Sequence, residues 1–296
     1  MAGLGGAARR SEAESGLRRV PGLRWFLGTF DALDAQAAAE RAAVDYDAPA
    51  EAARVRQILL IAAILLVLGY SFGDRPFFTE TFGPALGRRP GLARYADLLS
   101  YSYWSLAKLL GFGLLPLLHL LLRGERAADY GLGRQPAAVG SGVPRLPWLR
   151  TYLVLLAAVL PAVVAVSFAP TFQQSYPFYR QAGRSVFDFL GWELPYLLTF
   201  VAVEFFFRGY LLFGLRRAFG SHALFISMVP YCMIHVLKPA PEALGSIFSG
   251  LLLGTLALST GSLWCGVLLH ITVALTMDLL ASAQTHMLPA LSRFWP

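Results

Sequence analysis

The chain has 296 residues, of which 56% are hydrophobic and 15% are charged, and its formal net charge is +7. A soluble domain has about 25% charged residues, so this composition excludes a large water-soluble globular protein and indicates a protein that crosses a membrane several times. The basic residues do not form a stripe interleaved with aromatic side chains. We therefore expect membrane lipid around the chain and no nucleic-acid partner.

Residues 1–56 form a polar to amphipathic segment with eight arginines and eight acids. We expect the first 20 residues to be disordered and the alanine-rich part, about 32–56, to form a surface helix. The segment lacks the apolar core of a signal peptide. We therefore expect it to lie in the cytoplasm, ahead of the first membrane span.

Seven apolar stretches follow, each near the roughly 20 residues that a membrane-spanning helix needs. They lie at residues 57–72, 101–122, 150–169, 190–215, 221–237, 243–259 and 262–282. Connectors with glycine and proline separate them. The predicted fold is all-α, a polytopic transmembrane helical bundle of about seven spans. We expect residues 57–185 to form accessory helices, 186–282 to form the core of the bundle and 283–296 to form a tail.

The lysines and arginines between the spans predict the orientation. With the amino terminus inside the cell, the inner segments hold 15 of these residues and the outer segments hold 8. Basic residues gather on the cytoplasmic side of membrane proteins. We therefore expect a cytoplasmic amino terminus and an external carboxyl terminus, in the inner (plasma) membrane of the cell.

Ionisable residues inside the spans are few, and most lie in the last four. A charge at the bilayer centre costs roughly 2.5–3.5 kcal/mol on insertion scales, so such residues usually face the protein interior and mark function. This half of the chain contains Glu193, Glu204, Arg208, His235, Lys238, Glu242, His270 and Asp278. The second span adds Lys108, expected to reach the interface or pair with an acid such as Glu193, and His119.

Glu204 and Arg208 stand four residues apart in the stretch VAVEFFFRGYLLFGLRR, so they share one face of a helix. One interpretation is a buried ion pair that locks two helices together. The other is a carboxylate that its arginine keeps ionised, which suits a base or a ligand of water. The three phenylalanines between them would exclude lipid from the pair.

His235 and His270 are, taken singly, ordinary interior histidines. Together with Glu204, at similar depth on three helices, they can perform general acid–base work on a carbonyl. The same three residues can hold a zinc ion with one open position. Their spacing leaves both interpretations open, and these are the expected ligands if a metal is bound.

Lys238 and Glu242 form a second pair at four-residue spacing, with Pro239 and Pro241 between and beside them. We expect a helix end followed by a kinked turn. Either the lysine is interfacial with its counter-ion, or Glu242 folds back towards the site. Asp278, two turns after His270, is a polar partner in the bundle or the exit of its span.

In order, spacing and depth these residues resemble the CPBP or Abi family, which comprises intramembrane CAAX-prenyl-protease-2 and bacteriocin-processing proteases. The family pattern is Glu-Glu-x-x-x-Arg on one helix, Phe-x-x-x-His on the next and His-x-x-x-Asn or Asp on a later one. The resemblance covers about residues 186–282. The matching stretches are Val203-Glu204-Phe-Phe-Phe-Arg208, Tyr231-Cys-Met-Ile-His235 and His270-Ile-Thr-Val-Ala274. The strings EFFFRG, HxxKPxPE and MD after the last histidine look like a recurring variant branch of this family.

The resemblance implies an intramembrane endopeptidase, of glutamic or metal-dependent type, that cleaves a membrane-associated protein or peptide precursor. It implies that Glu204 and His235 activate the nucleophilic water and that His270 supports the oxyanion. Arg208 is then expected to orient Glu204 and hold it ionised. The possible supporting residues are Tyr231, Lys238, Glu242 and Asp278.

Two departures from the family pattern leave alternatives open. Val203 replaces the first glutamate, and Ala274 replaces the last asparagine or aspartate. The alternative function is therefore a catalytically inactive membrane scaffold or regulator. A transporter that uses the same buried charges is a third interpretation, weakened because the chain shows no internal repeat. Cys232 and Cys265 are expected to be small buried hydrophobes, with no disulfide.

Overall fold

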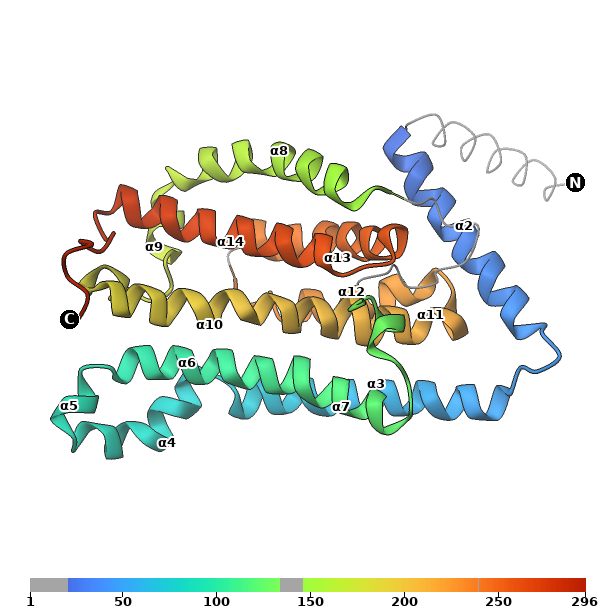
Figure 1. Ribbon diagram of the computed structural model, residues 1–296, viewed down its shortest axis with the longest axis horizontal. Helices are drawn as coiled ribbons and strands as arrows, with labels where there is room; N and C mark the ends of the chain where they lie inside the picture. Colours follow the sequence, from blue (N-terminus) through green and yellow to red (C-terminus); the bar gives the residue numbers. More distant parts are fainter. Residues whose placement is uncertain (1–20, 134–145, 239) are drawn as a thin grey trace, which may run out of the picture.

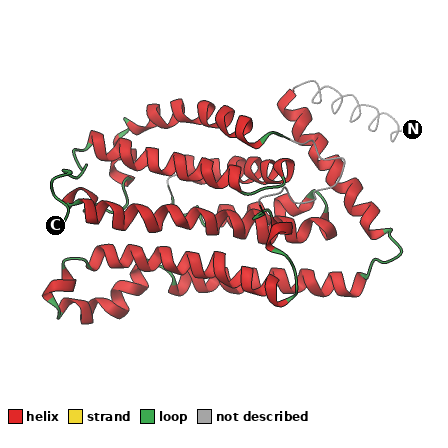
Figure 2. Cartoon of the chain, viewed as in Figure 1, coloured by secondary structure: helices red, strands yellow, loops and turns green. Residues whose placement is uncertain are grey.

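The computed structural model describes residues 21–133, 146–238 and 240–296. All regular structure in these residues is helical, as Figure 2 shows. Long helices run side by side along one axis, and short helices connect their ends (Figure 1). The predicted all-α, polytopic bundle is confirmed, whereas the prediction of disorder in residues 1–20 lies outside the described residues.

The first half of the chain forms one surface helix and two long rods. Its helices are α2 (Pro21–Arg41), α3 (Ala48–Phe72), α4 (Arg75–Gly87), α5 (Pro90–Ala93), α6 (Ala96–Lys108), η1 (Leu109–Leu114), α7 (Leu115–Leu122) and η2 (Ala127–Tyr130). The helix predicted over about 32–56 is instead split at residues 42–47. Asp47 starts α3 there, because its side chain accepts a hydrogen bond from the Ala50 N–H and a proline follows in the first turn.

The second half contains the rod that carries the acidic motif. Its helices are α8 (Trp148–Ser167), α9 (Pro170–Ser175), η3 (Ala182–Arg184), α10 (Val186–Glu204), η4 (Phe205–Phe213), α11 (Gly214–Phe219), α12 (His222–Met233), α13 (Ala240–Thr260) and α14 (Trp264–Gln284). α10, η4 and α11 form one continuous rod, in which η4 is π-helical.

Six helical segments in the described part of the chain are long and apolar enough to cross a membrane. The predicted fifth span, 221–237, is different, because its helix α12 has only 12 residues. At 1.5 Å per residue it is about 18 Å long, short of a hydrocarbon core of about 30 Å. Within the described residues, the predicted set of about seven spans is therefore corrected to six long helices and one short apolar helix, α12. α2 lies at one end of the bundle, and the carboxyl terminus lies at the other (Figure 1).

The rod of α10, η4 and α11 is the centre of the bundle. In its apolar stretch 78% of the residues are buried, against 0% in α8. All residues of η4 are buried, and those other than Gly209 are at most 4% exposed. Phe206 of η4 stacks on Phe112 of η1, with 4.6 Å between the ring centroids. Protein rather than lipid therefore surrounds Glu204 and Arg208, as buried charges require.

Asp34 ties α2 to the bundle. Its carboxylate accepts hydrogen bonds from the Ser221 N–H at 2.7 Å and from the Ser221 hydroxyl at 2.9 Å, at the start of α12. Gly220 has a φ of +55°, and a Cβ there would lie 2.3 Å from Asp34 Oδ1, so this close approach requires glycine. α2 is thus docked on α11 and α12 as part of the fold.

Candidate active site

Glu204 ends α10, and Arg208 lies in the π-helical segment that follows. Both side chains are 1% exposed, and Arg208 Nη1 lies 3.3 Å from Glu204 Oε1. The three phenylalanines between them are at most 3% exposed. The predicted pair on one helix face is confirmed. Its π-helical setting was not predicted, and such segments are frequent at functional sites.

His270 of α14 faces the same carboxylate. Its Nδ1 lies 2.9 Å from Glu204 Oε1. Gly266, one turn earlier on α14, makes this approach possible, because a Cβ there would lie only 2.9 Å from Glu204 Oε2. Glu204 therefore lies between an arginine on its own rod and a histidine on another helix.

The polar atoms of this cluster are close together but outside standard hydrogen-bond geometry. Glu204 Oε1, both Nη atoms of Arg208 and His270 Nδ1 are buried and have no hydrogen-bond partner among the residues that the structure describes. Buried charges without such partners are costly, and each one calls for an explanation. Here the attraction between Glu204 and Arg208 holds the cluster together. The atoms without a hydrogen-bond partner remain able to bind a further polar group.

α12 contributes Tyr231 and, just beyond its end, His235. The Arg208 guanidinium lies 4.0 Å above the centroid of the Tyr231 ring, and the Tyr231 hydroxyl lies 3.4 Å from His270 Nε2. His235 Nδ1 lies 2.8 Å from the Tyr231 carbonyl oxygen. Because a carbonyl only accepts, this contact places the proton of neutral His235 on Nδ1 and a lone pair on Nε2.

A cavity of about 620 Å³ lies beside the cluster. His235, His270 and Tyr231 line it, together with an apolar wall from α8, α9 and α14. That wall includes Val159, Ala162, Val163, Val166, Phe172 and Met277. Within the described part of the chain, Glu204 and Arg208 are not among the lining residues. The two histidines therefore face the cavity, and the buried carboxylate lies behind His270.

Glu242, in the first turn of α13, lines the same cavity. It forms a salt bridge with Lys238, and the Tyr176 hydroxyl donates to it at 3.2 Å. Burial and the charge of Glu242 raise the pKa of Tyr176, so this hydroxyl stays protonated. Glu242 therefore pairs with Lys238 and also borders the cavity, so these two alternatives do not exclude each other. The helix end and turn are confirmed as well, with Pro239 itself outside the described residues.

Asp278 belongs to a different cluster. It is fully buried and accepts a hydrogen bond from Trp192 Nε1 at 2.8 Å. Glu193 of α10 is its acidic neighbour. Asp278 is therefore a polar partner between α10 and α14, which was one of the two predicted roles. The described structure does not bring it to the cavity.

Four other residues singled out from the sequence lie outside the cavity. Lys108 lies over the Trp104 ring, 4.5 Å from its centroid, and no ion pair with Glu193 is found in the described structure. The Tyr210 hydroxyl lies 2.9 Å from His119 Nδ1. Both cysteines are free thiols, as expected, with Cys265 buried and Cys232 half-buried.

Glu204, His235 and His270 do not form a zinc donor set in this arrangement. Within residues 21–133, 146–238 and 240–296, no group of three or more His, Cys, Asp or Glu side chains is placed to hold a metal ion. Glu204 Oε1 lies 2.9 Å from Nδ1 of His270 and Glu204 is not among the residues that line the cavity, so this carboxylate is not placed beside the two Nε2 atoms as a third ligand. We therefore derive no step through zinc.

Two residues of the site were missed from the sequence, Tyr176 and Gly266. Tyr176 lies between spans, and only the fold brings it to Glu242. Gly266 has no side chain that could indicate a role. Its position one turn before His270 on the same helix was the one sign in the sequence that it lies near the site.

Comparison with known proteins supports the motifs. Residues 185–276 match the family model described as Rce1-like, type II CAAX prenyl endopeptidase Rce1-like. The match confirms the CPBP resemblance over this segment, which includes Glu204, Arg208, His235 and His270 and stops short of Asp278. The family is a protease family, which supports an endopeptidase within a multi-pass membrane protein. No curated protein and no solved structure matched the chain.

Proposed function

We propose that the protein is an intramembrane endopeptidase that hydrolyses a peptide bond of a membrane-associated polypeptide in the cavity beside α12 and α14. One observation carries the proposal. The buried Glu204 carboxylate lies 2.9 Å from Nδ1 of His270, while His270 and His235 line one cavity of about 620 Å³. A carboxylate behind an imidazole orients it as a general base. The family match supports protease chemistry in general.

The geometry favours roles that differ from those the resemblance implies. Glu204 is 1% exposed and lies behind the cavity wall, so it is a positioning residue in this proposal. Its negative charge, 2.9 Å from His270 Nδ1, favours the tautomer that carries the proton on Nδ1 and leaves a lone pair on Nε2. His270 is then the base that activates water, instead of a support for the oxyanion.

His235 helps to place the water. Its Nδ1 donates to the Tyr231 carbonyl at 2.8 Å, so its Nε2 can accept a hydrogen bond from the same water that His270 deprotonates. Two acceptors fix both O–H bonds of the water and direct its lone pair towards the substrate carbonyl.

The proposed reaction consumes only water. The water oxygen forms a bond with the scissile carbonyl carbon as His270 Nε2 removes one proton. Negative charge develops on the carbonyl oxygen, where the Tyr231 hydroxyl, which lies under the Arg208 guanidinium, is our proposed donor. The C–N bond then breaks, and the His270 imidazolium returns its proton to the leaving nitrogen.

The cavity wall indicates a substrate with an apolar part. α8, α9 and α14 present aliphatic and aromatic side chains, while Lys238, Glu242 and Tyr176 supply a polar border. The family description names CAAX prenyl endopeptidases. For this chain we propose the broader class of polypeptides or peptide precursors with an apolar membrane anchor.

Cleavage by the purified, liposome-reconstituted protein tests the function, with a library of fluorogenic peptides carrying an apolar anchor as the probe. Glu204→Gln and His270→Ala are each expected to lower kcat/KM by about 100-fold or more, as general-base catalysis contributes about 10²–10⁴-fold. His235→Ala should also lower kcat. The matched controls are Glu80→Gln and His222→Ala, two exposed positions. Cleavage by Glu204→Gln and His270→Ala at the wild-type rate would refute the proposal, and liposome flux without cleavage would favour a transporter.

Metal content and chelator sensitivity of the same preparation test the zinc-dependent variant. Stoichiometric zinc, with cleavage that a chelator removes and zinc restores, would overturn the metal-free roles of Glu204, His235 and His270. Cleavage that is indifferent to the chelator supports them.

One observation favours the inactive scaffold or regulator. Ala274, where the family has Asn or Asp, lines the cavity and presents a methyl group there. A missing oxyanion donor costs roughly 2.7–4 kcal/mol in the transition state. A scaffold would keep its cellular phenotype in Glu204→Gln, which preserves shape, whereas a protease would lose it.

We also propose a cytoplasmic amino terminus and an external carboxyl terminus in the inner membrane, on the distribution of basic residues. Single-cysteine variants at two exposed positions, Asp45→Cys and Ser292→Cys, test this in a background without the native thiols. A membrane-impermeant maleimide should label Ser292→Cys in intact cells and Asp45→Cys only after lysis. The reverse pattern would contradict the orientation.

A further inference from the structure

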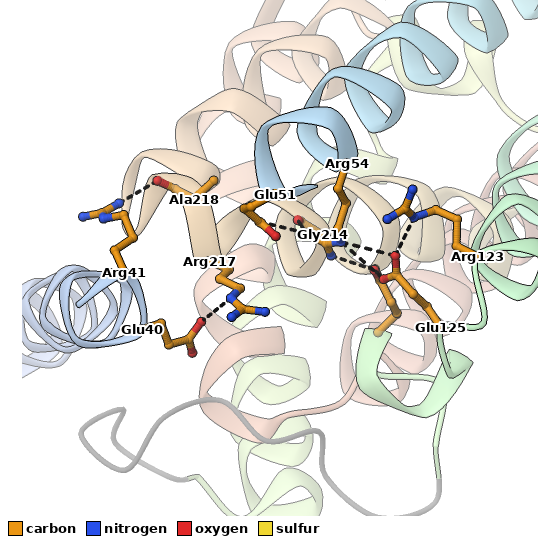
Figure 3. Close-up of polar contacts among 10 residues, drawn as sticks. Glu40, Arg41, Glu51, Arg54, Arg123, Glu125, Gly214, Arg217 and Ala218 are labelled. Atoms are coloured by element: carbon orange, nitrogen blue, oxygen red, sulfur yellow. Dashed lines mark hydrogen bonds and ion pairs between the residues drawn. The ribbon is translucent and has the colours of Figure 1, made fainter. Parts of the chain in front are cut away.

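A second cavity, of about 520 Å³, is formed by α2, α3, α11 and the segment from the end of α7 through η2. Figure 3 shows charged side chains from these elements turned towards one another. It lies away from the candidate active site, because α11 and α9 are at opposite ends of the central rod (Figure 1) and α9 borders the first cavity. The proposed protease reaction does not use it.

Arginines outnumber acids around this cavity. It is lined by Arg54, Arg126, Arg216 and Arg217 and by Glu40, Glu125 and Asp129. Figure 3 also shows Arg41 and Arg123 near these elements, and Arg41 donates to the Ala218 carbonyl at 2.7 Å. The cavity is therefore positively charged overall.

Arg54 is the centre of a network of hydrogen bonds and ion pairs that we call the framework. It donates to the Gly214 carbonyl at 2.7 Å and to the Tyr130 hydroxyl at 2.8 Å, and it pairs with Glu51 at 3.1 Å and Glu125 at 3.3 Å. These contacts join α3, η2 and α11. Arg54 is thus fully engaged and shapes the cavity rather than serving a ligand.

Glu125 is likewise saturated. It accepts from Tyr130 and pairs with Arg123 at 2.8 Å in addition to Arg54. Burial alone would raise its pKa, but the hydrogen bonds from Tyr130 and Arg123 and the charge of Arg54 outweigh burial and lower it. The acid therefore stays charged and is neutralised by the framework, so it does not offset the remaining arginines.

Arg126 and Arg217 are the cations available to a ligand. Arg126 is exposed, and none of the described residues forms an ion pair with it. The Arg217 side chain is 48% exposed, and its contact is Glu40 at 3.2 Å, a carboxylate that also accepts from Gln36 at 2.7 Å. Asp129 is the acid of the cavity that opposes them.

The cavity lies where apolar helices end. α7 finishes with Leu121 and Leu122, which are 54% and 79% exposed, and Arg123 follows directly. Apolar side chains exposed in this way face lipid in a membrane-spanning bundle, and the charged residues beyond them meet the headgroup layer. Basic pockets between helices at this depth bind anionic lipid headgroups.

We propose that this cavity binds a phosphate group, supplied by the headgroup of an anionic phospholipid, through Arg126 and Arg217. Guanidinium groups bind phosphate oxygens with paired hydrogen bonds, and a volume of about 520 Å³ lies within the roughly 300–1,000 Å³ of small-molecule sites. Because Arg54 joins α3 to the end of the central rod, occupancy stabilises the bundle at this end. The site is independent of the proposed protease activity.

The test uses the full chain in phosphatidylcholine nanodiscs, with and without phosphatidylglycerol, and measures bound phosphatidylglycerol by native mass spectrometry and Tm by thermal unfolding. Arg126→Gln should weaken retention roughly fivefold, which corresponds to about 1 kcal/mol for one basic residue at an anionic surface. Arg126→Lys should keep most of it. Asp129→Asn should strengthen retention, and Arg88→Gln, at an exposed position in the turn after α4, should leave it unchanged.

A second arm adds inorganic phosphate to the phosphatidylcholine nanodiscs. Retention of phosphatidylglycerol that depends on Arg126, with no Tm rise from inorganic phosphate, supports the lipid as the source. An Arg126-dependent Tm rise from inorganic phosphate alone supports the phosphate site and assigns it to the free ion. If Arg126→Gln matches wild type in both arms, or if Asp129→Asn weakens retention, the proposal is overturned.

Discussion

Gly266 determines whether His270 can reach Glu204, although it has no side chain of its own. Its Cα lies against the carboxylate, and a methyl group there would come within 2.9 Å of Glu204 Oε2. The order and spacing of Glu204, Arg208 and His270 predicted one shared helix face for the first two and a similar depth for the histidine, and the structure brings the three side chains together. The glycine was not predicted, because which helix face approaches a carboxylate depends on packing between distant segments.

Gly266→Ala is the first prediction at the scale of the residue. The added methyl group should separate α14 from Glu204 and misplace His270, and a displacement near 1 Å can cost about 100-fold in rate. Peptide cleavage by the reconstituted variant measures the effect. Gly111→Ala is the matched control, since nothing lies within 4 Å of a Cβ at that helical position. Equal losses in the two variants would contradict the close approach at Gly266.

Asp278 provides a second prediction, because the structure places it with Trp192 rather than at the cavity. Asp278→Asn keeps an oxygen for the Trp192 N–H and should leave cleavage within about twofold of wild type. Asp278→Ala leaves a buried donor unpaired, which costs about 1–3 kcal/mol of stability. Chemical unfolding in detergent and cleavage assays measure the two effects. A large loss of activity in Asp278→Asn, at unchanged stability, would show a role in the reaction.

At the scale of the element, two features escaped prediction. The apolar stretch 221–237 suggested a full span, yet its helix stops at Met233 and the chain turns before α13. Hydropathy reports composition, and it does not report where a helix ends. The π-helical segment η4 was missed for a similar reason. A π-helix and an α-helix can be formed by the same kinds of residue, and here the wider turn depends on the surrounding aromatic packing.

The docking of α2 gives a prediction at this scale. Asp34→Ala removes the acceptor for the Ser221 N–H and hydroxyl at the start of α12, and loss of such a cap costs about 0.5–2 kcal/mol. Tm in detergent should fall, and limited proteolysis should cut more readily between α2 and α3. Asp45→Ala, at an exposed position in that connection, is the control. Unchanged proteolysis in Asp34→Ala would show that other contacts hold α2.

For the whole molecule, composition was sufficient to predict an all-helical multi-pass bundle, since 56% hydrophobic residues leave few other folds. It could not predict that the chain builds two cavities of different character. The apolar cavity is lined by the two histidines of the candidate active site, and the arginine-rich cavity lies at the opposite end of the central rod. Each joins residues far apart in the sequence, such as Tyr176 with Glu242 and Arg54 with Gly214.

Acid should weaken the ion pairs of Glu125 beside the arginine-rich cavity and so lower the stability of the whole bundle. The pKa of Glu125 lies below its ordinary value of 4.5, so its stabilising contribution is present above that pH and is lost as the pH falls through the folded value. Unfolding should therefore become easier below about pH 4.5, and Glu125→Gln should flatten this dependence. Thermal unfolding across pH measures it, with Glu80→Gln as the control. An identical pH profile for Glu125→Gln and wild type would contradict the role of this carboxylate.

The most direct measurement of the central claim is the cleavage rate of Glu204→Gln beside wild type, in the same liposomes with the same apolar-anchored peptide. The variant keeps the shape of the side chain and removes the charge that orients His270. We expect a folded protein whose kcat/KM falls by about 100-fold or more. A folded Glu204→Gln protein that cleaves the peptide as fast as wild type would contradict it.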